Sequence, residues 1–101
     1  MFLNYHHTVA AVDTPVELFE VATGKSMLLL EISAAAGENA GKLTLIANNG
    51  TSDVFSWAID LSAGENADLS PQKIRLFVEG YTLSVKGSAL GLSCYLSCVE
   101  K

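Results

Sequence analysis

The chain has 101 residues, enough for one domain that buries its core without a metal or a disulfide. Eleven acidic and six basic residues give a formal net charge of -5, and the basic residues are scattered, which argues against a surface that tracks nucleic-acid phosphates. Half of the residues are apolar and 17% are charged, so we expect a well-filled core with apolar surface left over for a partner.

The N-terminal segment lacks the basic and apolar regions of a secretory signal. Apolar runs such as residues 27–30 are far shorter than the roughly 20 residues that span a membrane. We therefore expect a protein that is made in the cytosol and has no membrane partner.

Residues 1–13 have mixed polarity and no clear period, which favours an N-terminal arm or a frayed first strand ahead of a domain at 14–101. A short strand is expected from Thr14, with Pro15 at its start, where a missing N–H does little harm. After a turn at 23–25, residues 26–34 are apolar at most positions. Such a run is typical of a strand that is covered on both faces, and it predicts a central strand.

The next two strands are predicted by a strong turn signal. A glycine-bounded loop at 36–41 precedes a strand at 42–47, and Asn48-Asn49-Gly50 favours the positive φ angles of a type I′ turn. This turn predicts a hairpin with a strand at 53–61, and we expect Trp57 to be the centre of the core. Alternation directs these side chains inward: Leu43, Leu45 and Ala47 on the first strand, and Phe55, Trp57, Ile59 and Leu61 on the second, opposite Val54, Ser56, Ala58 and Asp60.

The clearest alternation in the chain lies at 73–86, and it predicts a second hairpin that turns at Gly80. On the first strand, one face is expected to carry Ile74, Leu76 and Val78, and the opposite face Lys73, Arg75, Phe77 and Glu79. On the returning strand, one face is expected to carry Tyr81, Leu83 and Val85. The preceding segment, 62–72, is expected to be a polar connection. Its AGENA at 63–67 repeats the AGENA at 36–40, which indicates two similar turns or, alternatively, a duplicated hairpin unit.

A turn at 87–91 leads to a last strand at 92–100. Seven or eight short strands with turn signals between them, and no helical period, predict an all-β fold. We expect a single antiparallel β-sandwich of jelly-roll or immunoglobulin-like type, whose strand order the pattern leaves open.

Cys94 and Cys98 are the two cysteines of the chain. On a strand this spacing puts them on one face about 13 Å apart, too far for a disulfide. We therefore expect two reduced thiols that line the core together with Leu96. The alternative is a metal site that the thiols form with His6 and His7, which no carboxylate pattern supports; we expect the histidines to be exposed.

The motifs for phosphate binding and for hydrolytic catalysis are incomplete in this sequence. Residues 22–26, ATGKS, resemble the end of a phosphate-binding loop, but Phe19 stands where that motif needs a glycine, and a strand is expected where a helix should begin. No serine lies in a Gly-x-Ser-x-Gly elbow. We expect the strand carboxylates to be solvated, with a glycosidase-type pair as the alternative: Glu17, Glu20, Glu31, Asp60 and Glu79. The sequence predicts no catalytic residue, no cofactor-binding residue and no metal ligand, and hence no enzyme.

Turns and strands in a particular order give a more specific likeness. Gly24-Lys25-Ser26 leads into an apolar strand, Leu61-Ser62-Ala63-Gly64-Glu65 forms a turn, and residues 76–85 with the final Val99-Glu100 complete the order. Over residues 14–100 the chain thereby resembles a group of small β-sandwich virion proteins from tailed bacteriophages and prophages. One departure is Tyr81, which stands where that group usually has an acidic residue.

The resemblance implies a structural part of the particle with no catalytic site. The expectation we favour is a head decoration (cement) protein that binds the capsid surface and stabilises the particle, made in the bacterial host cytoplasm and located in the virion. It implies a symmetric homo-oligomer, a trimer by analogy with the group, that contacts the major capsid or tail protein. The alternatives are a tail, neck or fibre accessory protein, and a carbohydrate- or receptor-binding sandwich with its site in the loops 36–41, 62–72 and 87–91.

Overall fold

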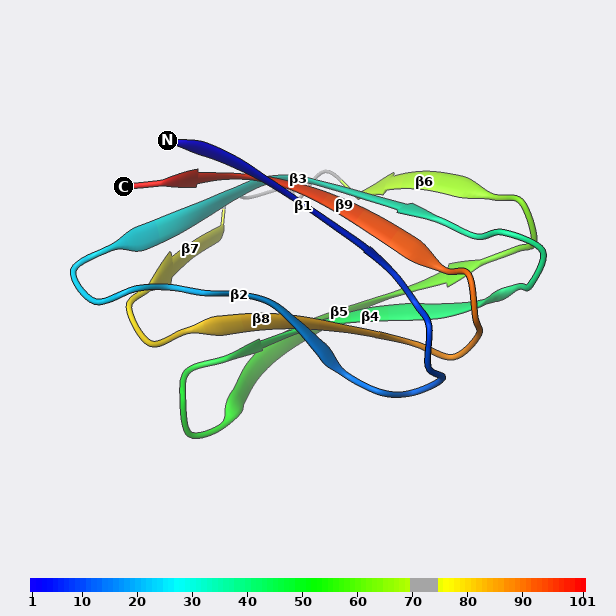
Figure 1. Ribbon diagram of the computed structural model, residues 1–101, viewed down its shortest axis with the longest axis horizontal. Coiled ribbons are helices and arrows are strands. Elements are labelled where there is room, and N and C mark those ends of the chain that lie inside the picture. The colour runs from blue at the N-terminus through cyan, green and yellow to red at the C-terminus, as the bar shows by residue number, and fades with distance from the viewer. Residues whose placement is uncertain (70–74) are drawn as a thin grey trace.

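The computed structural model describes residues 1–69 and 75–101, which form two antiparallel sheets packed face to face (Figure 1). The prediction of an all-β antiparallel sandwich is confirmed. The described residues contain nine strands where the sequence predicted seven or eight: β1 (Phe2–Thr8), β2 (Val16–Glu20), β3 (Ser26–Ala35), β4 (Gly41–Asn48), β5 (Asp53–Leu61), β6 (Asn66–Leu69), β7 (Arg75–Val78), β8 (Thr82–Gly87) and β9 (Ser93–Glu100).

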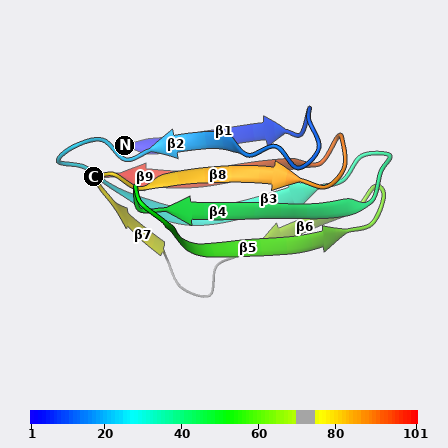
Figure 2. The same ribbon diagram turned by 90° about the horizontal axis from the view of Figure 1, so that it is seen from below.

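The strand orders are β1-β9-β3-β6 in one sheet, where β7 also pairs with β3, and β2-β8-β4-β5 in the other (Figure 2). β3 is central, as predicted. β9 pairs along one side of it, while β7 and β6 share the other side, opposite residues 26–29 and 32–35 respectively. The edge strands β1 and β2 lie at one side of the sandwich, and β5, β6 and β7 lie at the opposite side (Figure 2).

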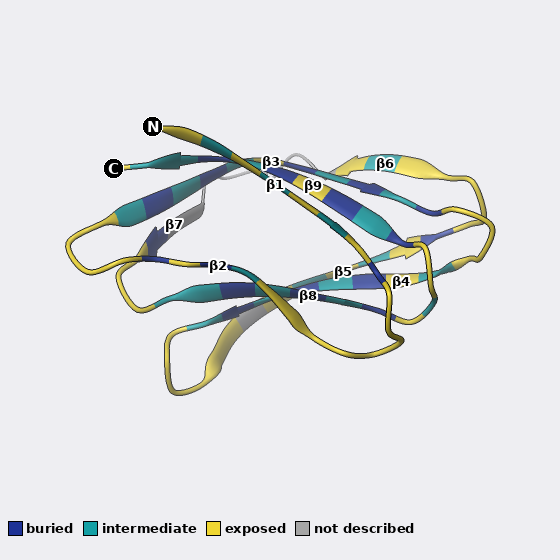
Figure 3. Ribbon diagram, in the orientation of Figure 1, coloured by how far each residue is buried: buried dark blue, intermediate teal, exposed yellow. Residues whose placement is uncertain are grey.

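Buried residues alternate with more exposed ones along many of the strands (Figure 3), and the buried residues of both sheets form one core cluster. Aromatic rings cross it as a chain of contacts, with ring centroids 5.2 Å apart for Tyr5 and Phe19, 5.9 Å for Phe19 and Phe77, and 6.2 Å for Phe77 and Tyr81. Such offset and edge-to-face contacts are the arrangements that aromatic rings favour. The largest fully buried side chains are Phe77, Met27, Leu29, Leu45, Leu83, Leu92 and Leu96.

The predicted hairpin at 73–86 is wrong, because its two strands belong to different sheets. β7 pairs with β3, whereas β8 pairs with β2 and β4. The turn between them is present, with Gly80 at φ 87° and the Tyr81 N–H donating to the Val78 carbonyl at 3.2 Å. Alternation defines the faces of a strand but not its partner, so a tight turn between two alternating runs is equally compatible with a crossing from sheet to sheet.

The predicted face of β7 is also inverted at its described side chains. Phe77 is 1% exposed and Val78 is 48% exposed, although the sequence grouped Val78 with the apolar face and Phe77 with the charged one. Burying the larger aromatic side chain removes more apolar surface from water. On the next strand Leu83 and Val85 are both buried, as predicted. Lys73 and Ile74, and the side chains of Arg75 and Leu76, lie outside the described part.

β4 and β5 form the predicted hairpin, with Leu43, Leu45, Ala47 and Leu61 buried. Trp57 points inward as predicted but is only half-buried, so its expected place at the centre of the core is wrong. Trp57 instead packs against the rim of the core from the edge strand β5, and Phe77 is the most deeply buried aromatic side chain among the described residues. The side chain of Phe55 is outside the described part of the structure.

The turn of this hairpin is wider than the predicted type I′ turn. Asn48 pairs with Asp53, which leaves four residues between the strands, and Gly50 has a positive φ of 101° while Asn49 does not. The Asn49 Oδ1 accepts hydrogen bonds from the Thr51 N–H, the Thr51 hydroxyl and the Ser52 N–H, at 3.0, 2.9 and 3.0 Å. These side-chain hydrogen bonds hold the wider turn, in which Asn49 does not need the positive φ angle of a two-residue type I′ turn.

The expected polar connection at 62–72 contains β6, so that prediction is wrong in part. β6 pairs with the second half of β3, and the ladder continues into the loops beyond it. There the Ala36 N–H donates to the Glu65 carbonyl, and the Gly64 N–H donates to the Gly37 carbonyl, both at 2.8 Å. The two AGENA segments therefore lie side by side and bind each other. Pro71 and Gln72 lie outside the described residues.

For the N-terminal segment the sequence left open an arm or a frayed strand. Residues 2–8 form β1, and each has a register partner in β9. Val9 follows directly and is 4% exposed. Residues 2–8 are thus a full strand of the first sheet, although the sequence placed the start of the domain at residue 14.

Candidate functional site

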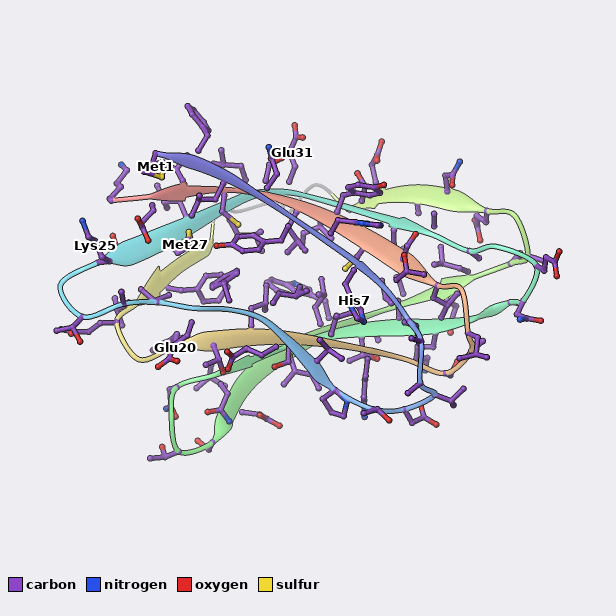
Figure 4. All side chains as sticks on the ribbon, in the orientation of Figure 1. Met1, His7, Glu20, Lys25, Met27 and Glu31 are labelled. Carbon is purple, nitrogen blue, oxygen red and sulfur yellow. The ribbon has the colours of Figure 1, made fainter. Side chains whose placement is uncertain are left out.

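The outer face of the sheet β1-β9-β3-β6 is the candidate binding surface, and alternate residues of neighbouring strands build it. Glu31 projects away from the sandwich on this face, whereas Met27 of the same strand points between the sheets (Figure 4). The register aligns Asn4, Ser97 and Glu31 in one row across the strands. The outward residues of β1 and β9 are Phe2, Asn4, His6 and Thr8, paired with Val99, Ser97, Tyr95 and Ser93.

An aromatic pair lies on β1 and β9, at one side of this face. Tyr95 is 57% exposed, and its ring stacks on the imidazole of His6 with centroids 4.3 Å apart and planes 18° apart. The pair belongs to a row that crosses four strands, because Ser33 follows as the register partner of Tyr95, and Asp68 as that of Ser33. The Ser33 hydroxyl donates to the Asp68 carboxylate at 2.9 Å.

Polar groups surround the aromatic pair. The Ser97 hydroxyl donates to the Asn4 Oδ1 at 3.1 Å. A shallow depression of about 120 Å³ lies beside them, lined by Glu31, Ile32, Ser33 and Asp68. The face thus combines a flat aromatic surface with amide, hydroxyl and carboxylate groups, which suits a docked protein surface or the ring and hydroxyls of a sugar.

Cys94 and Cys98 line the core with Leu96, as predicted, and neither forms a disulfide. Burial raises the pKa of each thiol from 9.0 to about 11. Both are therefore protonated at neutral pH, and a protonated buried thiol is a poor nucleophile and a poor metal ligand.

The histidines lie on opposite faces of β1. His6 is exposed, as predicted, but His7 is half-buried and is the register partner of Cys94. The metal alternative gains no support, since the described part of the chain holds no group of three or more histidine, cysteine, aspartate or glutamate side chains suited to a metal ion.

The Gly24-Lys25-Ser26 segment is the turn between β2 and β3. Gly24 has φ 77°, and its N–H donates to the Glu79 carboxylate at 3.2 Å. β3 begins at Ser26, so a strand follows the turn, as expected, and the chain's own carboxylate uses one N–H that a phosphate cradle would need.

The strand carboxylates are exposed, as predicted for a solvated surface. They are distributed over separate parts of the molecule. Glu17 and Glu20 are on the edge strand β2, Glu31 is on the outer face of the first sheet, Asp60 lies opposite Lys42 in the second sheet, and Glu79 binds the Gly24 turn.

Of the three segments that the sequence named as a sugar site, the loops 36–41 and 87–91 and the described start of 62–72, at residues 62–65, lie at one end of the sandwich (Figure 1). The Gly64 N–H donates to the Gly37 carbonyl at 2.8 Å, and the Asn39 amide reaches the Leu90 carbonyl at 3.5 Å. The Glu65 carboxylate accepts from the Ser62 N–H at 2.8 Å. Several polar groups of this end are therefore hydrogen-bonded within the molecule.

No protein-family model matches the chain, and no curated protein matches its sequence. Among the described residues no helix is long and apolar enough to cross a membrane.

The face with His6 and Tyr95 was missed by the sequence reasoning. The available signal was the alternation of β9, which buries Cys94, Leu96 and Cys98 and so must turn Tyr95 outward. Its neighbour His6 comes from the other end of the chain, and only the β1-β9 pairing brings the two rings together.

Proposed function

We propose that the protein is a structural component of a tailed-bacteriophage virion, a head decoration (cement) protein that binds the capsid surface through the outer face of its first sheet. The support is the likeness of residues 14–100 to small virion sandwiches, together with this fold. One observation supports this docking face: Phe2 and Tyr95 lie on the same sheet face and are 77% and 57% exposed. Large aromatic side chains left in water on one sheet face mark a surface that becomes more stable when a partner covers it.

The proposal also fits what the buried groups offer. The two thiols are held in the core with raised pKa values. The exposed carboxylates are spread over separate surfaces. A particle component needs a stable scaffold and an exposed surface for its neighbours, and the two described sheets are compatible with both needs.

The test is the protein composition of purified particles. Quantitative mass spectrometry of virions from a phage that encodes this chain should find it at a fixed ratio to the major capsid protein. Particles from a deletion strain should lose infectivity faster on heating and recover when purified protein is added. Absence of the chain from washed particles would contradict the proposal.

The docking face has its own test with a matched control. Tyr95→Ala and Phe2→Ser should each weaken binding to particles that lack the protein. Val54→Ser changes a side chain that is 42% exposed in β5 of the other sheet, and it should leave binding unchanged. If all three changes alter binding to the particles equally, the capsid contact does not lie on this face.

Carbohydrate or receptor binding is the second candidate, and it is favoured by the exposed Tyr95 ring and the polar side chains near it. An exposed ring with Ser33, Asp68 and Asn4 nearby provides a stacking surface and hydrogen-bonding groups. A glycan array should then show ligands whose binding is lost in Tyr95→Ala and kept in Val54→Ser. A silent array would remove this candidate without affecting the first.

A further inference from the structure

The sandwich has open strand edges, and they differ in how they are protected against pairing with another chain. An edge strand exposes unpaired N–H and C=O groups, which proteins usually guard with charges, proline, bulges or short strands. β2 follows Pro15, carries Glu17 and Glu20, and shifts register between Glu17 and Phe19. β5 carries Asp53 and Asp60, and β6 and β7 are strands of four residues each.

β1 has none of these features. Its seven residues, FLNYHHT, contain no proline and no lysine, arginine, aspartate or glutamate. Its register with β9 is uninterrupted from Phe2 to Thr8. Of the described edges, β1 is therefore the one that presents a regular, uncharged strand to solvent.

The hydrogen bonds at the two ends of β1 show which residues face the open side. The Met1 carbonyl accepts from the Glu100 N–H at 2.9 Å, and the Val9 N–H donates to the Leu92 carbonyl at 2.7 Å. In a regular antiparallel ladder alternate residues bond to the same neighbour, so the odd-numbered residues bond to β9. The N–H and C=O groups of Phe2, Asn4, His6 and Thr8 then point away from β9, toward the open side.

Exposed apolar side chains gather on the same side of the molecule. β1, β2 and the link between them carry Met1, Phe2, Val12 and Val16, which are 78%, 77%, 49% and 38% exposed. These are four of the eight large apolar side chains that are exposed among the described residues. The side of the sandwich formed by β1 and β2 thus offers both unpaired backbone groups and apolar area.

We infer that β1 pairs antiparallel with β1 of a second copy of this chain, about a two-fold axis at Tyr5. This register places Phe2 beside Thr8 of the second copy and Asn4 beside its His6, and it forms about eight backbone hydrogen bonds, two for each narrow pair. Inward residues stay inward in both copies, so the two first sheets become one continuous sheet.

A second copy fits this edge better than a different strand for two reasons. The chain has a net charge of -5, yet β1 is free of carboxylates, so two copies meet here without the repulsion expected at β2 or β5. The antiparallel pairing is also self-complementary, as a two-fold contact must be. The inference is independent of the virion proposal, which concerns the sheet face and not its edge.

The test is native mass by light scattering across a dilution series, with two variants at one position. Asn4→Pro removes an N–H on the open side, which β9 does not use, and edge strands tolerate such a proline. Asn4→Ala loses the same side chain, including its bond to Ser97, but keeps the N–H. We expect a dimer for the wild type and Asn4→Ala, and half that mass for Asn4→Pro at every concentration.

A second variant covers the case in which Asn4→Pro does not fold. Asn4→Lys combined with His6→Lys keeps every backbone group but sets lysines beside lysines across the two-fold axis, so it should also be monomeric. Hydrogen exchange of the wild type should show the amides of Asn4 and His6 protected at high concentration and exposed on dilution. A wild-type monomer at all concentrations, or a trimer in which these amides exchange freely, would overturn the inference.

Discussion

Phe19 in one sheet and Phe77 in the other meet edge to face, with ring centroids 5.9 Å apart and ring planes at 66°. Phe77 is 1% exposed and also contacts Tyr81. Replacing Phe77 by alanine should lower the free energy of unfolding by about 3–5 kcal/mol, because the buried ring leaves a cavity between the sheets. Urea unfolding followed by far-UV circular dichroism measures this.

The control is the next residue in the same strand. Val78 is 48% exposed, so Val78→Ala should change the free energy of unfolding by less than about 0.5 kcal/mol. Similar losses in the two variants would contradict the orientation of β7.

Hydrophobic periodicity predicted much of this fold. The inward faces of β4 and β9 follow from alternation, because a pleated strand sends successive side chains to opposite faces. The central place of β3 follows from its apolar residues on both faces. These properties belong to single strands, so a single stretch of sequence contains them.

Pairing and burial depth could not be predicted in the same way. The partner of β7 depends on β3, which lies some 50 residues earlier, and the burial of Trp57 depends on which side chains of the other sheet pack against β5. β6 has only four residues, too few to show a period. The candidate face was missed for a related reason, since the pairing of β1 with β9 joins the two ends of the chain and sets His6 against Tyr95.

Gly87 allows β8 to lie close to the start of the β1-β2 link. A Cβ atom at this position would come within 2.7 Å of the Val9 Cγ2, and Val9 is itself 4% exposed. Gly87→Ala should therefore destabilise the fold by about 1–3 kcal/mol through overpacking. Thermal unfolding of Gly87→Ala, Val9→Ala and the double variant tests the cause. The double variant should lose less than the two single losses added together, and strict additivity would show that the two sites do not touch.

Asn49 holds the β4-β5 turn through one oxygen that accepts three hydrogen bonds. Asn49→Ala should lower the free energy of unfolding by about 0.5–1.5 kcal/mol, since the bonds are solvent-exposed and their net contribution is small. Asn49→Asp keeps the acceptor oxygen and should stay much closer to the wild type. If both variants lose the same stability, the oxygen is not what holds the turn.

The buried thiols make the stability of the fold depend on pH in the alkaline range. Burial raises the pKa of Cys94 and of Cys98 from 9.0 to about 11. Between these values the unfolded chain releases the thiol protons while the folded chain keeps them, so the folded state binds more protons and the free energy of unfolding falls as pH rises. The contribution is fully present below pH 9 and is lost progressively up to about pH 11.

Urea midpoints measured from pH 8 upward in half-unit steps test this, with Cys94→Ala combined with Cys98→Ala as the control. The control should be less stable at pH 8, because two buried side chains are truncated, but its midpoint should fall less steeply above pH 9. Burial also raises the pKa of Tyr5, with Cys98 and Glu100 adding to the rise, so a residual slope from this phenol should persist above pH 10 in both proteins. Parallel slopes from pH 9 to pH 10 would mean that the thiols titrate alike in the folded and unfolded chains, and the buried-thiol account would then fail.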